Sequence, residues 1–149
     1  MSNACVICRA DAADLSGILA LYAQLNPGDT PTDPAISEAV WAEIRRDDHF
    51  LYLVAKVAAT IVGTCNVSLI PNLTRTGRPF ALIENVIVLA DFRRRKIGRL
   101  LMEAAIAEAR AKNCYKIILL SSRKRPEAHH FYESLGFDGD SKKGFEIRF

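Results

Sequence analysis

Apolar residues recur along the chain with two spacings, and each spacing predicts a different kind of element. Spacings of three and four residues predict helices, whereas short runs rich in branched residues predict strands. The predicted helices cover residues 14–25, 36–46, 97–112 and 126–135. The predicted strands cover residues 4–9, 50–56, 60–70, 80–89, 116–120 and 145–149. In the second helix, Ile36, Val40 and Ile44 mark the apolar stripe.

The order of these elements predicts a single sheet. Residues 80–89 are almost continuously apolar, as expected of a central strand covered on both faces. The helix and strand that follow complete a crossover, which joins parallel strands, while the short connection between residues 56 and 60 predicts a hairpin. We therefore predict an α/β (α+β) fold, with one mixed sheet flanked by helices on both faces and a single domain over residues 1–149.

Size and composition favour a small soluble protein. The chain has 149 residues, half of them hydrophobic, which is enough for one core. No apolar run reaches the roughly 18 residues needed to cross a bilayer. Near the N-terminus, acidic residues lie where a signal peptide would have an apolar block. Four cysteines without such a signal predict a reducing, cytoplasmic location. Cys5 and Cys8 resemble half of a zinc site, but no second pair follows, so we expect no metal.

Positive charge is concentrated rather than spread. The net charge is only +3, yet Arg93–Lys96 and Arg123–Arg125 form dense basic clusters. This pattern favours local binding of an anion over a nucleic-acid surface, which usually carries a larger basic excess with interleaved aromatic residues. We therefore expect neither a nucleic-acid partner nor a membrane partner.

The first basic cluster lies between a predicted buried strand and the start of a helix. The first amides of a helix have no backbone partner and lie at the positive end of its dipole, so a pyrophosphate could collect several hydrogen bonds there. On spacing alone, a solvated basic turn explains the cluster equally well.

Two segments together resemble the GCN5-related N-acetyltransferase (GNAT) superfamily. The coenzyme A loop of that family has the pattern Arg/Gln-x-x-Gly-x-Gly/Ala, where x is any residue. In residues 93–98 of this chain, Arg93 and Gly98 match the first and last positions, and Lys96 stands in place of the first glycine. Residues 128–137 resemble the family segment that ends in Phe-Tyr, two residues, Leu or Cys, Gly-Phe. The resemblance implies the partly splayed acyl-CoA N-acyltransferase fold, with acetyl-coenzyme A as cosubstrate.

The same resemblance implies which residues hold the cosubstrate. The expected binding residues are Val86, Ile87, Val88, Arg93, Arg94, Arg95, Lys96, Ile97, Gly98 and Arg99. We expect Lys96 to adopt helical dihedral angles with its side chain turned outward, so that the amides of residues 94–99 still line the site.

Acetyl transfer needs a deprotonated amine, because an alkylammonium with a pKa of about 10.4 is almost fully charged at neutral pH. Glu84, on the central strand, is the candidate base, acting through water; the alternative is that it pairs with an arginine or caps the sheet edge. Asn85 is expected to face the other side of the sheet. By resemblance, Tyr132 lies beside the sulfur and returns a proton to it, the alternative being a core aromatic residue. A backbone amide near Val88 is expected to meet the oxyanion.

The acceptor stays open at this stage. Residues 83–88 and 114–119 are similar to parts of the glucosamine-phosphate N-acetyltransferases, but those enzymes continue with an acidic residue where this chain has Leu120, Ser121 and Ser122. A small-molecule amine is favoured; the alternatives are a protein amine and an acetyl-coenzyme A sensor without turnover. By resemblance, a homodimer is expected.

Overall fold

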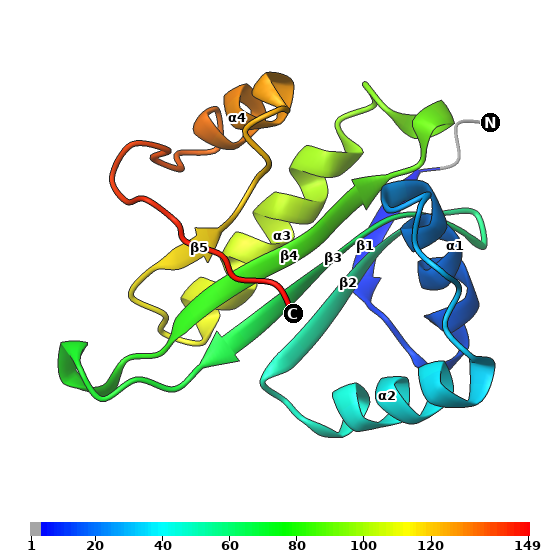
Figure 1. Ribbon diagram of the computed structural model, residues 1–149, viewed down its shortest axis with the longest axis horizontal. Coiled ribbons are helices and arrows are strands. Elements are labelled where there is room, and N and C mark those ends of the chain that lie inside the picture. Colours follow the sequence, from blue (N-terminus) through cyan, green and yellow to red (C-terminus); the bar gives the residue numbers. More distant parts are fainter. Residues whose placement is uncertain (1–3) are drawn as a thin grey trace.

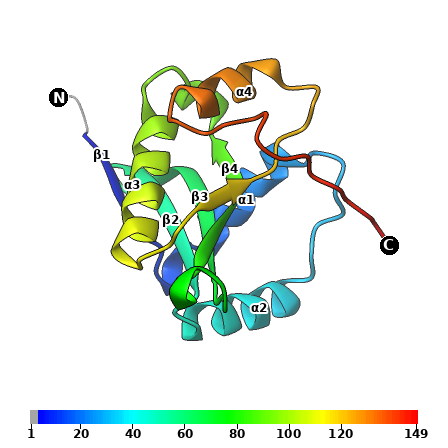
Figure 2. The same cartoon turned by 90° about the vertical axis from the view of Figure 1, so that its left-hand side faces the viewer.

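The structure, a computed structural model, describes residues 4–149 and contains a five-stranded sheet with helices on both faces (Figures 1 and 2). The first four strands are antiparallel neighbours, and the last pair is parallel, so the sheet is mixed as predicted. In spatial order the strands are β1 (Cys5–Arg9), β2 (Phe50–Val57), β3 (Thr60–Ile70), β4 (Phe80–Val88) and β5 (Ile117–Leu119). The helices are α1 (Leu15–Leu25), α2 (Pro34–Arg46), α3 (Ile97–Ala111) and α4 (Pro126–Glu133).

Local sequence explains where these helices begin. The carboxylate of Asp33 accepts a hydrogen bond from the amide of Ala35 at 2.8 Å, and Pro34 occupies the first turn of α2, where its missing amide costs nothing. Asp11 and Asp14 cap each other's backbone in the turn before α1. After α4, Gly136 has a φ of 97°, the left-handed conformation expected of a residue that ends a helix.

Two hydrophobic cores lie on opposite faces of the sheet. The larger lies between the sheet and α3, and the smaller joins α1 and α2 to the other face through Ile18, Trp41 and Val54. Helix α3 lies very close to β3 because Gly63 has no side chain: a Cβ there would be 3.0 Å from Leu101 Cδ1 and 3.1 Å from the Ile87 carbonyl oxygen. This close packing places the start of α3 directly beyond the end of β4.

The apolar stripe predicted for α2 is partly wrong. Trp41 is only 6% exposed, whereas Ile36 and Val40 are 57% and 48% exposed. Helix α2 turns the face that carries Ser37 and Trp41 toward the sheet, because the large indole fills the space above Tyr52 in an edge-to-face contact at 5.2 Å.

Strand β4 separates from β5 after three paired residues. Ala81–Ile83 pair with β5, but β4 continues to Val88 with no strand on that side in residues 4–149. On its other side β4 stays paired with β3, apart from a register shift between Thr64 and Asn66. Asn85 lies at this bulge with a φ of 53°. The predicted splay of the sheet is therefore present, and the bulge lies beside it.

The predicted strand at residues 145–149 is wrong. These residues form no strand in the structure, and Phe145 and Ile147 are 87% and 78% exposed. The alternation of apolar and polar residues in 145–149 indicates only a local preference for an extended backbone. A strand also needs a neighbour to pair its amides and carbonyls, and no strand within residues 4–149 pairs with that segment.

The turn between β4 and α3 contains two left-handed residues that are not glycine. Arg94 has a φ of 61°, and Lys96, which immediately precedes α3, has a φ of 61° and a ψ of 8°. The helical conformation expected for Lys96 is wrong: the residue is left-handed, so it closes the turn and the helix begins at Ile97. A residue with a Cβ is strained there by about 1–2 kcal/mol.

We predict that Lys96→Gly raises the free energy of unfolding by about 0.5–1 kcal/mol, because release of the left-handed strain exceeds the extra backbone entropy of glycine in the unfolded chain. Lys96→Ala is the matched control, since it removes the same charge but keeps a Cβ in the left-handed turn. Urea denaturation of both variants measures the difference. An alanine variant as stable as the glycine variant would show that charge, not backbone conformation, governs this position.

Candidate functional site

The turn before α3 presents an unbroken series of backbone donors. Within the described residues, the amides of residues 94–99 donate to no acceptor, while the flanking amides of Arg93 and Leu100 bond to the carbonyls of Ala90 and Lys96 at 3.2 and 3.0 Å. Three of these donors belong to the first turn of α3, at the positive end of its dipole. Such an arrangement suits a diphosphate, which can accept many hydrogen bonds at once.

Five cations surround these amides, and some of them have structural roles. Arg95 stacks over the Phe92 ring at 4.9 Å, and Arg99 donates to the Ser134 hydroxyl at 2.9 Å. The latter bond fastens the end of α4 to the start of α3. Arg94 and Lys96 form no ion pair with any residue the structure describes. The turn therefore keeps uncompensated positive charge for an anionic ligand.

The end of β4 supplies an open strand edge beside this turn. The Leu89 amide donates to the Val62 carbonyl at 2.9 Å and so faces β3; by alternation, the backbone groups of Val88 face the open side. The Val88 carbonyl there accepts from Gln24 Nε2 at 3.2 Å and Arg93 Nε at 3.4 Å. Gln24 also accepts from the Ala90 amide at 3.0 Å, so α1 helps to fix the turn. The sequence analysis did not identify Gln24.

Tyr132 lies on the α3 face, beside this open edge. Its ring packs between Phe131 and Phe137, with centroids at 5.3 and 6.1 Å, and contacts the core to which Val86 and Val88 also belong. Burial raises the pKa of Tyr132, and the nearby positive charge of Arg125 opposes the rise only in part. The phenol therefore holds its proton throughout the neutral range and can donate it.

Glu84 lies on the other face of the sheet. Tyr52, Asn66 and Glu84 are cross-strand neighbours on β2, β3 and β4, and Tyr52 packs against Trp41 of α2, so all three belong to the α1–α2 face. The Glu84 side chain is exposed and forms no ion pair with the residues described. The structure therefore contradicts the alternative in which Glu84 pairs with an arginine.

Three buried polar atoms on the α1–α2 face lack a partner in the described chain: the Tyr22 hydroxyl, Asn66 Oδ1 and Trp41 Nε1 on α2. The Tyr22 hydroxyl lies near Tyr52 and the Asn85 side chain but makes no hydrogen bond of good geometry, and Asn66 Oδ1 is also unsatisfied in the described chain. Burial, reinforced by Tyr52, raises the pKa of Tyr22 far above its ordinary value. Buried polar groups without partners are rare and can mark a place where a ligand completes the bonding.

The expected orientation of Asn85 is wrong. Simple alternation places it opposite Glu84, but the bulge inserts a residue and turns the Asn85 side chain toward Tyr22 on the α1–α2 face. The sequence analysis also missed Tyr22, Tyr52 and Asn66 as site residues. The one signal available was Asn66, a carboxamide inside the apolar strand β3; both tyrosines fit an ordinary core pattern.

Cys65 belongs to the core on the α3 face and sits opposite the bulge of β4. Burial raises the pKa of the Cys65 thiol to about 12, so it remains protonated. A protonated, enclosed thiol is a packing residue and not a nucleophile.

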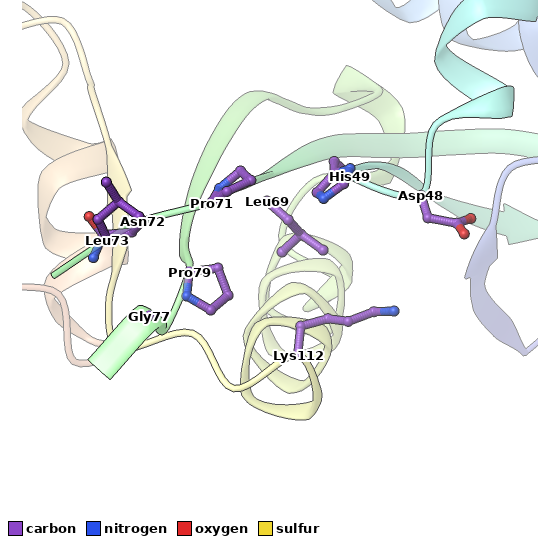
Figure 3. Close-up of a pocket in the computed structure, with 9 residues that line it drawn as sticks. All are labelled: Asp48, His49, Leu69, Pro71, Asn72, Leu73, Gly77, Pro79 and Lys112. Carbon is purple, nitrogen blue, oxygen red and sulfur yellow. The ribbon is translucent and has the colours of Figure 1, made fainter. Parts of the chain in front are cut away.

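A cavity lies at the other end of the sheet (Figure 3). It measures about 470 Å³ and is lined by residues of the β3–β4 loop, by His49 at the start of β2 and by Lys112 at the end of α3. None of the predicted site residues lines it. His49 is held by Asp47, 2.8 Å from its Nδ1 atom, so we assign this cavity no part in the chemistry.

The described residues contain no group of three or more His, Cys, Asp or Glu side chains placed to hold a metal ion. In the same part of the chain, no helix combines the length and apolar character needed to cross a membrane.

Comparison with known proteins agrees with this geometry. The model of the Acetyltransferase (GNAT) family matches residues 17–137. A glucosamine 6-phosphate N-acetyltransferase of Trypanosoma brucei brucei is 34% identical over 132 residues, covering 85% of this chain and 84% of that protein. A solved structure of a proposed acetyltransferase from Agrobacterium tumefaciens str. C58 has a TM-score of 0.92 at 40% identity and covers 97% of this chain and 99% of that chain.

A structure named as a transcriptional regulator from Bacillus halodurans C-125 has a TM-score of 0.91 at 30% identity, covering 98% of this chain and 100% of that chain. The family model spans most of the sheet, the basic turn and the segment that carries Tyr132. The chain therefore belongs to the GNAT family, whose members transfer an acetyl group from acetyl-coenzyme A to an amine.

Proposed function

We propose that this enzyme acetylates a primary amine of a small molecule by direct attack of the amine within a ternary complex. The observation that carries the proposal is the series of partnerless amides at residues 94–99, directly beyond the open edge of β4. A candidate base and a candidate acid lie on either side of that edge. We further propose that residues 1–149 work as one acetyltransferase domain.

The chain's own groups fit acetyl-coenzyme A. Its diphosphate would be held by the amides of residues 94–99 and by the side chains of Arg93, Arg94, Arg95, Lys96 and Arg99, with Ile97 and Gly98 shaping the first turn of α3. Its pantetheine amides would lie along the β4 segment Val86, Ile87 and Val88 and pair with the backbone groups of that segment that face the edge left open by β5, those of Val88 among them. The bound cosubstrate supplies the activated acetyl group.

Three groups of the protein would act on the reacting atoms: a base, a donor to the oxyanion and an acid. Glu84 accepts a proton from the acceptor ammonium through water, which converts it into a nucleophile. The amide near Val88 donates to the oxygen on which negative charge develops. Tyr132 holds a proton for the departing sulfur, and its buried, neutral phenol supports that role. Cys65 and Cys114 take no part, because direct transfer requires no covalent enzyme intermediate.

The acceptor would bind on the α1–α2 face. Tyr22, Asn66 and Asn85 supply polar atoms beside Glu84, and two of these atoms lack partners in the described chain. A phosphorylated amino sugar is the first acceptor to test, because the relative named for that activity covers 85% of this chain. Leu120, Ser121 and Ser122 stand where we expect an acid in that enzyme class, so other amines belong in the same test.

The enzyme is further proposed to act in the cytoplasm as a homodimer. Cys5, Cys8, Cys65 and Cys114 are all free thiols, which supports a reducing compartment.

A second candidate function is an acetyl-coenzyme A sensor without turnover, favoured by the relative named as a transcriptional regulator. Release of coenzyme A thiol, measured across a panel of amines, separates the two functions. The panel contains glucosamine 6-phosphate, glucosamine, a polyamine, free lysine and a lysine-containing peptide. We expect at least one small amine to raise release above background hydrolysis. Binding of coenzyme A without any such increase would support the sensor, and stimulation by the peptide alone would support a protein acetyltransferase.

Tyr132→Phe is expected to lower kcat by about 100-fold or more, the range of lost general acid catalysis, because the ring remains but the proton is gone. Affinity for coenzyme A should change little. Tyr115→Phe is the matched control, since Tyr115 packs against Phe80 near the opposite end of β4. Steady-state kinetics and calorimetric binding check both variants. An unchanged kcat for Tyr132→Phe would leave the phenol a packing role only.

Glu84→Gln is expected to depress kcat/KM most at low pH, where the acceptor amine is most fully protonated and help from a base matters most. At high pH the amine loses its proton unaided, so the variant should approach the parent enzyme. Glu108→Gln serves as control, because Glu108 pairs with Arg9 at 3.1 Å, away from the site. Superimposable pH profiles for parent and Glu84→Gln would rule out Glu84 as the base.

A further inference from the structure

The carboxamide of Gln24 forms two hydrogen bonds with the backbone at the end of β4. Its Nε2 atom donates to the Val88 carbonyl at 3.2 Å, and its Oε1 atom accepts from the Ala90 amide at 3.0 Å. A carboxamide can donate and accept at once, as the peptide group of a neighbouring strand does. Gln24 therefore takes the place of such a strand at a point where β5 no longer pairs with β4.

Gln24 lies in the last turn of α1, and that helix is firmly placed. Ile18 and Leu21, on its buried face, are each only 1% exposed, and α1 packs against both β3 and β4 (Figure 1). The Asn26 amide donates to the Tyr22 carbonyl at 2.9 Å, so the helical hydrogen bonding continues to the end of α1. A side chain on such a helix can hold the end of a strand in one position.

The Val88 carbonyl accepts a second, longer hydrogen bond, which comes from Arg93. Arg93 Nε lies 3.4 Å from this oxygen, and the Arg93 side chain is exposed. In the proposed complex the diphosphate would compete for that guanidinium, because a charged acceptor forms a stronger hydrogen bond than a carbonyl does. Gln24 is uncharged and half-buried, so it would continue to hold Val88 when the cosubstrate is bound.

The position of Val88 matters because its amide is the proposed donor to the oxyanion. The amide and the carbonyl of one residue face the same side of a strand, so a restraint on the Val88 carbonyl also restrains the direction of its amide. Such a donor is effective only when it is in place before charge develops. The last turn of α1 also carries Tyr22, whose hydroxyl lies near the Asn85 side chain on the proposed acceptor side. Gln24 thus connects the acceptor side with the cosubstrate side.

We propose that Gln24 is a positioning residue for acetyl transfer. By bonding Val88 and Ale90 to α1, it directs the Val88 amide at the thioester oxygen and fixes the distance between the acetyl group and the acceptor amine. The inference rests on the proposed function, in which acetyl-coenzyme A lies along the end of β4. Gln24 itself touches none of the reacting atoms, and the amides of residues 94–99 hold the diphosphate without its help.

Infrared spectroscopy of bound acetyl-coenzyme A, labelled with ¹³C at the thioester carbonyl, tests this role without any acceptor. A hydrogen bond to the carbonyl oxygen lowers the stretching frequency, so we expect a downward shift on binding to the parent enzyme. Gln24→Met keeps the length of the side chain but removes both hydrogen bonds, and most of the shift should be lost. Ser16→Met is the matched control, because it places the same side chain at an exposed position of α1, and it should reproduce the parental shift.

Kinetics with an acceptor found in the amine panel give a second readout. Gln24→Met should lower kcat about tenfold, less than the loss of an oxyanion donor, because the donor is displaced and not removed. The Kd of coenzyme A should stay within about threefold of the parental value, since the lost interaction acts in the transition state. Gln24→Asn keeps the carboxamide but is one methylene shorter, so it cannot reach both partners and should lose activity as Gln24→Met does. Ser16→Met should keep the parental kcat.

Several outcomes would overturn the positioning role. One is a parental carbonyl shift or a parental kcat in Gln24→Met, and another is full activity of Gln24→Asn. An equal loss of kcat and of coenzyme A affinity, together with a lower Tm, would also overturn it, because Gln24 would then support the whole turn. Bound acetyl-coenzyme A without any shift in the parent enzyme would contradict the Val88 donor and this inference with it. A parent enzyme that fails to bind acetyl-coenzyme A would instead refute the proposed function.

Discussion

The separation of β4 from β5 is the constraint on which the remainder of the site depends. Three residues of β4 pair with β5, and the next five do not, so backbone groups that a regular sheet would satisfy internally stay available. Because Gly63 lets α3 approach the sheet closely, the helix begins where that open edge ends. Open strand and partnerless helix amides therefore form one continuous polar surface, suited to a long ligand with amides at one end and phosphates at the other.

The bulge in β4 has a second consequence, which concerns the acceptor. By adding one residue opposite Cys65, it brings Glu84 and Asn85 onto the same face as Tyr22, Tyr52 and Asn66. Tyr132 remains on the opposite face, among core aromatic residues. The proposed base, Glu84, and the proposed acid, Tyr132, can serve one reaction only where the sheet is open between its two faces. The splay of β4 and β5 provides that opening.

Stability and binding compete in the basic turn. Left-handed Arg94 and Lys96 carry backbone strain, and five cations lie close together with few acidic partners. Both features are unfavourable for the protein alone, yet both keep donors and charge directed toward a common ligand. Strain of this kind persists only where surrounding packing imposes it, and here the buried Ile97 and the bond from Arg99 to Ser134 hold the turn.

The sequence by itself determined most elements, because hydrophobic periodicity acts over a few residues: the structure contains all four predicted helices and the first five predicted strands, with small shifts of their ends. It also pointed to the basic turn and Tyr132, since their motifs are contiguous. Only the tertiary structure decided the orientation of Asn85, the partnerless atoms of Tyr22 and Asn66, the exposure of Ile36 and Val40, and the unpaired state of residues 145–149. Each of these depends on which strand or helix lies alongside, and that is set by contacts between residues far apart in the chain, which no local pattern encodes.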